Sequence, residues 1–287
     1  MQQKVKVRIG IVPEHFNVIW YYAKLKTYFE QLGIDVELIE YPSGSSPLAI
    51  DMDSGTIDMA VILTDSVIKS ITEGKNIQIT GVYVESPLNW GIHTGFNSRI
   101  TNINQIANKK FAVSRLGSGS HLIVKLYAYE KGFTINDDQF VVVENLTGAI
   151  RALNARDADV FFWDEFTTKP FVDDATFRLL DTFPTPWPAF VIAGNKTFLE
   201  NNVSTVRNIV EIVQRTAVSF CKLQDKVSII SERYKQEPED VQKWLQTVRW
   251  AKVPGITEYY LQNIINDLIK AQVIPLGTSA ENMLFHF

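Results

Sequence analysis

The sequence carries one short motif twice, 101 residues apart. Residues 54–60 read Ser-Gly-Thr-Ile-Asp-Met-Ala, and residues 155–161 read Ala-Arg-Asp-Ala-Asp-Val-Phe, so that Asp159 corresponds to Asp58. In both copies a short helical pattern comes before the motif and a buried strand pattern follows it. A strand–loop–helix unit also lies upstream of each copy. This repetition indicates two similar lobes, each with a sheet of its own.

Strand and helix patterns alternate along most of the chain, which is typical of α/β architecture with mostly parallel strands. Glycine ends several of the predicted helices, as it does at Gly33, because glycine readily adopts the left-handed cap conformation. The predicted strands are 5–12, 35–41, 57–63, 77–84, 110–114, 139–144, 158–163, 177–181 and 189–193. The predicted helices are 16–32, 47–53, 66–73, 103–107, 121–131, 147–154, 203–222, 226–234, 238–249 and 257–271.

Two irregular segments, 85–92 and 183–190, interrupt this pattern. The second contains three prolines within five residues, which favour a stiff, extended conformation. We interpret both segments as crossings between lobes. The sequence thus predicts an α/β protein with two Rossmann-like lobes joined by two hinge crossings. Lobe one is expected to comprise residues 1–88 and 191–287, including the C-terminal helices, and lobe two residues 89–190.

Composition excludes several classes of protein. The chain has 28 Lys and Arg against 32 Asp and Glu, and this mild acidity argues against a nucleic-acid partner. The one cysteine, Cys221, rules out an internal disulfide and a cysteine-based zinc site. We expect Cys221 to be buried in its apolar helical stretch. No segment approaches the roughly twenty apolar residues of a membrane span.

Catalytic and cofactor motifs are equally scarce. Residues 117–120 read Gly-Ser-Gly-Ser, but Leu122 breaks the dinucleotide-binding spacing and no P-loop lysine follows. There is no G-x-S-x-G nucleophile motif. His93 and His286 lie away from the other two histidines, which gives little support to a metal site. We therefore expect no cofactor, no metal and no catalytic residue.

The N-terminal sequence leads directly into the first strand, without the apolar core of a signal peptide. We expect a cytoplasmic protein on this basis. The alternative is a periplasmic protein whose export signal has already been removed.

Ligands of open parallel sheets bind beyond the carboxyl ends of the strands. Ser43–Ser46 and Gly117–Ser120 follow strands and combine glycine with serine, so their N–H and hydroxyl groups can hold an anion without lysine. The alternative is that these residues are only helix caps and turns. The candidate ligand-binding residues are His15, Asn17, Ser43, Ser45, Thr64 and Asp65 in lobe one, and Arg115, Ser118, Ser120, His121, Thr147, Trp163 and Glu165 in lobe two.

Three segments resemble motifs of a known superfamily. Residues 29–36 read Phe-Glu-Gln-Leu-Gly-Ile-Asp-Val, residues 54–60 carry the repeated motif, and residues 106–113 read Ile-Ala-Asn-Lys-Lys-Phe-Ala-Val. Together they are similar to scaffold motifs of type II periplasmic-binding proteins, in the branch with nitrate-, alkanesulfonate- and taurine-binding proteins and fungal thiamine-pyrimidine synthases. The resemblance extends over nearly the whole chain. In character the chain is most similar to intracellular eukaryotic members.

The resemblance implies two lobes that close over a small molecule. Our leading hypothesis is a non-enzymatic binder of a small organic ligand, with an anionic end and a polar or aromatic amine end, such as a sulfonate or a pyrimidine-like metabolite. The alternative is an enzyme of pyrimidine or thiamine-precursor biosynthesis with His15 or His121 as catalytic residue. The synthases carry a cysteine-rich iron motif, however, which one cysteine cannot provide. A third hypothesis is a sensor that acts on an unknown protein partner.

Overall fold

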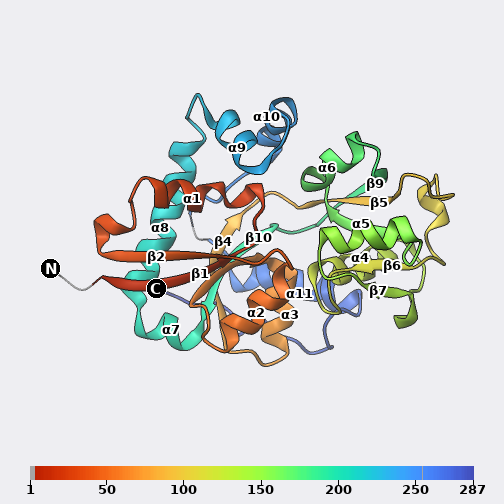
Figure 1. Cartoon of the computed structure of the whole chain (residues 1–287). Coiled ribbons are helices and arrows are strands. Elements are labelled where there is room, and N and C mark those ends of the chain that lie inside the picture. The colour runs from red at the N-terminus through yellow and green to blue at the C-terminus, as the bar shows by residue number, and fades with distance from the viewer. Residues whose placement is uncertain (1–3, 254) are drawn as a thin grey trace. The chain divides into compact units, whose positions relative to one another are not determined.

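Two five-stranded sheets organise the protein, which we describe from a computed structural model covering residues 4–253 and 255–287 (Figure 1). The contacts within the chain define two compact units. The first unit comprises the chain up to Ser86 together with Trp187–Ile265 and Ser279–Phe287. The second comprises Pro87–Pro186 and Asn266–Thr278. Each unit is therefore built from segments that lie far apart in the sequence.

The sheet of the first unit has the strand order β2-β1-β3-β10-β4. Strand β1 is parallel to β2 and β3, whereas β10 is antiparallel to both β3 and β4. Helices α2 and α3 cover one face of this sheet, and α1 and α8 cover the other (Figure 1). The strands are β1 Val5–Ile11, β2 Ile34–Glu40, β3 Met59–Leu63, β4 Ile77–Val84 and β10 Phe190–Asn195. The helices are α1 Val18–Leu25, α2 Ser45–Asp53, α3 Thr64–Thr72, α7 Lys196–Asn201, α8 Val203–Phe220, α9 Lys226–Tyr234 and α10 Pro238–Thr247, with short 3₁₀ helices η1 His15–Asn17 and η2 Glu30–Leu32.

The second unit repeats this design with the order β7-β6-β8-β5-β9. Strand β6 is parallel to β7 and β8, and β5 is antiparallel to β8 and β9. The strands are β5 Asn89–Gly95, β6 Phe111–Val113, β7 Phe140–Val142, β8 Val160–Asp164 and β9 Phe177–Pro184. The helices are α4 Gly119–Lys131, α5 Leu146–Ala155 and α6 Glu165–Asp173, with 3₁₀ helices η3 Ile103–Gln105 and η4 Asp137–Gln139. Helix α11, Glu258–Lys270, begins in the first unit and ends in the second.

Alternation along β8 shows how the core of the second unit is assembled. Phe161 and Trp163 stack on one face of the strand, with ring centroids 5.3 Å apart, and pack with residues of α5 and α6. Phe162 points to the opposite face, where it meets Tyr127 of α4 at 5.3 Å. Since successive strand residues face opposite sides, one run of three aromatics fills both layers of the core.

The repeated aspartates have the same role in each unit. Asp58 accepts a hydrogen bond from the backbone N–H of Arg8 at 2.7 Å, and Asp159 accepts one from the backbone N–H of Lys110 at 3.0 Å. In return, the backbone N–H of each aspartate donates to the carbonyl of the same residue. Each aspartate thereby ties the start of one strand to the neighbouring strand. The repeat is thus a structural device and confirms that the two halves are built alike.

The prediction of mostly parallel strands is confirmed in both sheets, each of which also contains one antiparallel strand. Strands β5 and β10 are the antiparallel members, and they begin shortly after Pro87 and Trp187, where the chain changes unit. Because the chain reaches β5 and β10 from the other unit, no crossover helix connects either strand to a preceding strand of the same sheet. The preference of βαβ units for parallel strands therefore does not apply to β5 and β10.

The predicted helix 16–32 is interrupted. Helix α1 ends at Leu25, and Thr27 has a positive φ of 56°. The N–H of Tyr28 donates to the carbonyl of Ala23 and that of Thr27 to Lys24, which is a Schellman motif. The turn places Phe29 in the core, stacked near Trp20 at a centroid distance of 6.1 Å. Because this turn contains no glycine, no local sequence signal predicts it.

The predicted irregular segments are shorter in the structure. Strand β5 already begins at Asn89, and β9 continues to Pro184, because β9 is an edge strand and tolerates a proline at its end. Two helices, α6 and α7, were absent from the predicted elements. Both begin directly after a strand, with Asp164 and Asn195 as side-chain caps. The prediction that Cys221 is buried is also wrong, because Cys221 lies exposed at the end of α8.

Candidate functional site

In the first unit, the candidate residues follow the carboxyl ends of three adjacent strands. His15 and Asn17 lie in η1, after β1. Ser43 and Ser45 follow β2, and Thr64 and Asp65 begin α3 directly after β3. Because β1, β2 and β3 are parallel neighbours, these three loops emerge at the same edge of the sheet.

His15 is enclosed by aromatic side chains. Its ring centroid lies 4.4 Å from that of Phe16 and 4.3 Å from that of Trp244, the latter in an edge-on contact. Burial lowers the pKa of His15 well below its usual value, because the charged imidazolium would lose its hydration. His15 is therefore neutral at physiological pH and serves as part of an aromatic cluster.

The loop after β1 is held from several sides. The Tyr83 hydroxyl donates to the carbonyl of Phe16 at 2.6 Å, and the Trp250 indole N–H donates to the same carbonyl at 2.9 Å. Asn17 is buried, and its side-chain amide donates to the carbonyl of Val12 at 2.8 Å. These bonds fix the position of η1 before any ligand is present.

Hydroxyl groups join the other two loops of the first unit. The Ser45 hydroxyl accepts from the backbone N–H of Leu63 at 3.4 Å, which links the start of α2 to the end of β3. The Thr64 hydroxyl donates to the carbonyl of Pro188 at 2.6 Å. Both side chains are buried and define the shape of the loops.

Asp65 is a buried carboxyl in the first turn of α3. It accepts hydrogen bonds from the backbone N–H and the hydroxyl of Ser66. Burial nevertheless dominates and raises the pKa of Asp65 to about 6, since the carboxylate loses more hydration than these bonds replace. A buried carboxyl with a shifted pKa at a strand end is a common feature of functional sites.

In the second unit, the loop after β6 holds four of the candidates. The Ser118 hydroxyl donates to the carbonyl of Arg115 at 2.7 Å and lies 3.0 Å from the hydroxyl of Ser120. The Ser120 hydroxyl in turn accepts from the backbone N–H of Ser114 at 3.0 Å. The serine hydroxyls therefore stabilise the loop itself. This agrees with the alternative that the Gly- and Ser-rich segment serves as a helix cap and turn.

His121 completes the loop from the first turn of α4. Its Nδ1 atom accepts from the backbone N–H of Gly117 at 3.0 Å, so a neutral ring carries its proton on Nε2. Gly117 has a φ of 81°, a conformation that favours glycine. The ring of His121 packs edge-on against Phe140 at 4.5 Å.

Three candidate side chains remain available to a ligand. Ser43 and Arg115 are half-buried and Thr147 is exposed in the first turn of α5. Among the hydrogen bonds and ion pairs of residues 4–253 and 255–287, none involves these three side chains. Arg115 therefore offers a guanidinium, at the strand end of the second unit, that no carboxylate neutralises.

The last two candidates have different surroundings. Trp163 lies in the core of the second unit, stacked on Phe161. Glu165 begins α6 and accepts a hydrogen bond from the side chain of Asn89 in β5. The structure thus places Glu165 at the strand end and Trp163 beneath it.

Asp164, which lies between these two residues, is not among the binding residues predicted from the sequence. Its carboxylate caps α6 by accepting from the backbone N–H of Thr167 at 2.7 Å and the Thr167 hydroxyl at 2.8 Å. Burial raises the pKa of Asp164 to about 7. An aspartate three residues before a threonine, directly after a strand, is the sequence signal for such a cap.

The described residues contain no group of three or more His, Cys, Asp and Glu side chains that could hold a metal ion. In the part of the chain that the structure covers, no helix has the length and apolar character needed to span a membrane.

The fold matches several solved structures. The Candida albicans CA3427 gene product, described as defining a new family with the generic periplasmic binding protein fold, superposes with a TM-score of 0.88 at 28% identity, over 96% of this chain and 92% of that chain. The alkanesulfonate-binding protein SsuA of Xanthomonas axonopodis pv. citri gives a TM-score of 0.83 at 14% identity, over 99% of both chains. The nitrate-binding protein NrtA of Synechocystis PCC 6803 gives 0.71 at 15% identity, over 96% of this chain and 84% of that chain.

These likenesses establish that the chain has the periplasmic-binding-protein fold, as the sequence motifs predicted. No curated protein sequence matches the chain. The comparison with protein families matches residues 13–227, well over half of the chain, to the family described as NMT1/THI5 like. The chain therefore belongs to the NMT1/THI5 like family.

Proposed function

We propose that this protein is a non-enzymatic small-molecule binder whose two units close over one ligand. The observation that carries the proposal is the repetition of the sheets, β2-β1-β3-β10-β4 and β7-β6-β8-β5-β9. Position by position, β1 corresponds to β6, β2 to β7 and β3 to β8. The polar loops described above follow these same strands in both units, which is where ligands of open α/β sheets bind.

The fold comparisons support the same proposal. Two proteins with this fold are named for the small anions they bind, alkanesulfonate in one case and nitrate in the other. Proteins that bind ligands between two lobes commonly work by hinge closure, in which the ligand favours the closed form through contacts that the open form lacks.

The charges at the strand ends define the ligand class that we propose. Arg115 provides a cation for an anionic group such as a sulfonate, carboxylate or phosphate. The buried carboxyls Asp65 and Asp164 suit a polar or aromatic amine. We therefore propose a small organic ligand with one anionic end and one amine-like end, a class that includes sulfonates and pyrimidine-like metabolites.

Equilibrium dialysis of the full chain against alkanesulfonates, phosphorylated pyrimidines and amino acids tests this proposal. We expect saturable binding of at least one class, weakened about tenfold or more by Arg115→Gln, because a charge-assisted hydrogen bond is worth roughly 1.5–3 kcal/mol. Arg151→Gln, which removes the same charge from the exposed surface of α5, is the matched control and should bind normally. Failure of the ligand-free protein to bind any member of the panel would count against the proposal.

A second candidate function is an enzyme of pyrimidine or thiamine-precursor biosynthesis. The match to the NMT1/THI5 like family favours it, as does the presence of His15 and His121 after the corresponding strands β1 and β6. The aromatic enclosure of His15 leaves its ring little room to react. Incubation with pyridoxal phosphate followed by intact-mass spectrometry distinguishes the two functions, since a histidine that serves as a substrate or nucleophile would change the mass.

The cytoplasmic location expected from the sequence remains part of this proposal. Fractionation of the cells in which the protein occurs, with markers for cytoplasm and for exported proteins, would test it.

A further inference from the structure

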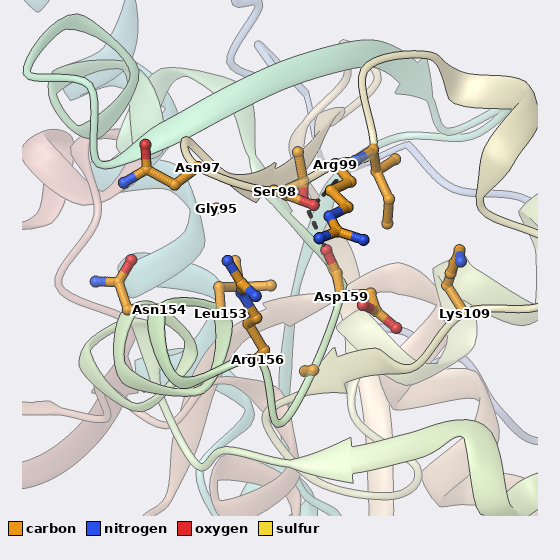
Figure 2. A pocket seen from close by; sticks show the side chains of 12 residues that line it. Gly95, Asn97, Ser98, Arg99, Lys109, Leu153, Asn154, Arg156 and Asp159 are labelled. Carbon is orange, nitrogen blue, oxygen red and sulfur yellow. Dashed lines mark hydrogen bonds between the residues drawn. The ribbon is translucent and has the colours of Figure 1, made fainter.

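A cavity lies within the second unit, at the opposite end of the sheet from the candidate ligand loops. It measures about 490 Å³ and is bordered by Lys109 and Asp159, which precede β6 and β8, and by Gly95 at the end of β5 (Figure 2). All residues that line it belong to Pro87–Pro186. A volume of this size accommodates a small organic molecule, since small-molecule sites measure roughly 300–1,000 Å³.

The side chains of the cavity carry an excess of positive charge. Arg99, Lys109 and Arg156 line it, against Asp159 as the one carboxylate among its described lining residues. Figure 2 shows Arg99 and Arg156 extending into the cavity from opposite walls. Within residues 4–253 and 255–287, none of the three cationic side chains takes part in an ion pair or a hydrogen bond. Unneutralised cations on facing walls create a strong preference for an anion.

The one carboxylate is already engaged in the fold. Asp159 accepts the backbone N–H of Lys110 at 3.0 Å, and its carbonyl accepts the hydroxyl of Thr94 at 2.9 Å. These two hydrogen bonds hold Asp159 between β6 and β8, at the floor of the cavity. It therefore balances only part of the charge contributed by the three cations.

The wall that carries Arg99 is braced from outside the cavity. Arg178 donates from Nη1 to the carbonyl of Ser98 at 3.2 Å and to that of Ile100 at 3.0 Å. Its guanidinium also lies 5.6 Å from the centroid of the Phe96 ring. Residues 96–100 thus form a supported turn, and Arg99 projects from a defined backbone.

The opposite wall has an unusual feature at Arg156, the C-cap of α5. This residue has a φ of 64°, a left-handed conformation in which glycine is usually found. Gly95 passes so close to the helix end that a Cβ atom on it would lie 3.2 Å from the carbonyl oxygen of Leu153. The end of α5 and the end of β5 are therefore tightly packed, and the guanidinium of Arg156 extends from this junction.

We propose that this cavity is a second ligand site that binds a small organic phosphate carrying at least two negative charges. The three cations recognise the phosphate, and the amide and hydroxyl groups of Asn97, Ser98 and Asn154 recognise hydroxyl groups of the attached organic part. The cavity is larger than a bare inorganic anion requires. The site lies at the far end of the sheet from Arg115, so it does not depend on the function proposed above.

Isothermal titration calorimetry of the full chain with ribose 5-phosphate tests this inference, with inorganic phosphate and ribose as comparison probes. We expect one saturable site for ribose 5-phosphate, weaker binding of inorganic phosphate and no binding of ribose. Affinity should fall with rising salt, because ions screen the attraction. Arg99→Gln and Arg156→Gln should each weaken binding about tenfold or more, as expected for loss of a charge-assisted contact.

Two variants separate this site from the alternatives. Arg151→Gln removes an exposed charge from the same helix outside the cavity and should leave the affinity unchanged. Arg115→Gln should also leave it unchanged. Absence of saturable binding in the parent protein would overturn the inference, as would equal weakening by Arg151→Gln and Arg156→Gln. Loss of binding in Arg115→Gln alone would place the phosphate at the strand-end loops and would equally overturn it.

Discussion

Asp65 is a residue whose environment has a measurable consequence for stability. Its pKa of about 6 in the folded protein lies above the ordinary value of 3.8, because burial disfavours the carboxylate. The folded state therefore holds this proton more tightly than the unfolded state does. The resulting contribution to stability is present below about pH 4 and is lost as the pH rises through about 6.

We accordingly expect Asp65→Asn to become more stable relative to the parent as the pH rises. The gain in the free energy of unfolding between pH 4 and pH 7.5 should be about 2 kcal/mol, since one pKa unit corresponds to about 1.36 kcal/mol and the carboxyl of the unfolded chain is already partly ionised at pH 4. Urea denaturation at both pH values measures it. Asp137→Asn, at the exposed start of η4, is the matched control for loss of a carboxyl. A difference between Asp65→Asn and the parent that does not change with pH would contradict the assigned burial.

Gly148 is a residue whose lack of a side chain is required by its surroundings. A Cβ atom at this position in the first turn of α5 would lie only 1.8 Å from the carbonyl oxygen of Val143. We expect Gly148→Ala to reduce the free energy of unfolding by about 3 kcal/mol or more, as backbone clashes in a packed loop do. Thermal denaturation followed by circular dichroism measures the effect.

Gly132 provides the comparison for this prediction. It caps α4 with a φ of 74°, and the space around its Cα is open. Gly132→Ala should therefore cost only about 1 kcal/mol, the usual penalty for a left-handed alanine. Equal losses at the two positions would show that Gly148 is not held against Val143 as described.

At the scale of elements, the two copies of the repeated motif should differ in strength. The carboxylate of Asp58 bonds the backbone of Arg8 and also its guanidinium, from Nε at 3.1 Å and from Nη2 at 2.6 Å. Among the hydrogen bonds of residues 4–253 and 255–287, the carboxylate of Asp159 accepts only the backbone N–H of Lys110. We expect Asp58→Ala to lower the free energy of unfolding by about 2 kcal/mol and Asp159→Ala by about 1 kcal/mol, a modest gap because Arg8 is partly exposed to solvent. Chemical denaturation of both variants checks the order, and a larger loss for Asp159→Ala would contradict it.

Most elements were predictable from sequence because their signals are local. Strands β1 and β4 appear as short β-branched runs, and Gly33 marks the end of η2 with a left-handed φ of 73°. The break in the first helix was not predictable, since its left-handed residue is Thr27 and the reason for the turn is the distant packing of Phe29 on Trp20. Tertiary contacts decided this boundary.

The positions of the strand-end loops were predictable from the sequence, whereas the role of each side chain in them was not. Position after a strand identified the segments that contain Ser45 and Ser118. Only the structure shows that both hydroxyls are engaged within their own units. It equally shows that Arg115 is unpaired among the described residues, because a missing partner depends on every neighbour in space and leaves no mark in the sequence. Whether any of these residues contacts a ligand stays a prediction.

At the scale of the whole molecule, the protein consists of two units of the same design. Matching strand orders and equivalent aspartate ties show that the chain uses one scaffold twice. Each scaffold brings its own polar loops to the carboxyl ends of its strands. We propose that one ligand uses both sets of loops, so a change in either unit should weaken the same binding event.

Native mass spectrometry of the full chain, purified from the cells in which it occurs, tests that claim most directly. We predict a bound small molecule whose occupancy falls in both Ser43→Ala of the first unit and Arg115→Gln of the second, and is unchanged in Arg151→Gln and Arg156→Gln. A parent protein that carries no small molecule, or a bound molecule that is indifferent to the change in one of the two units, would contradict it.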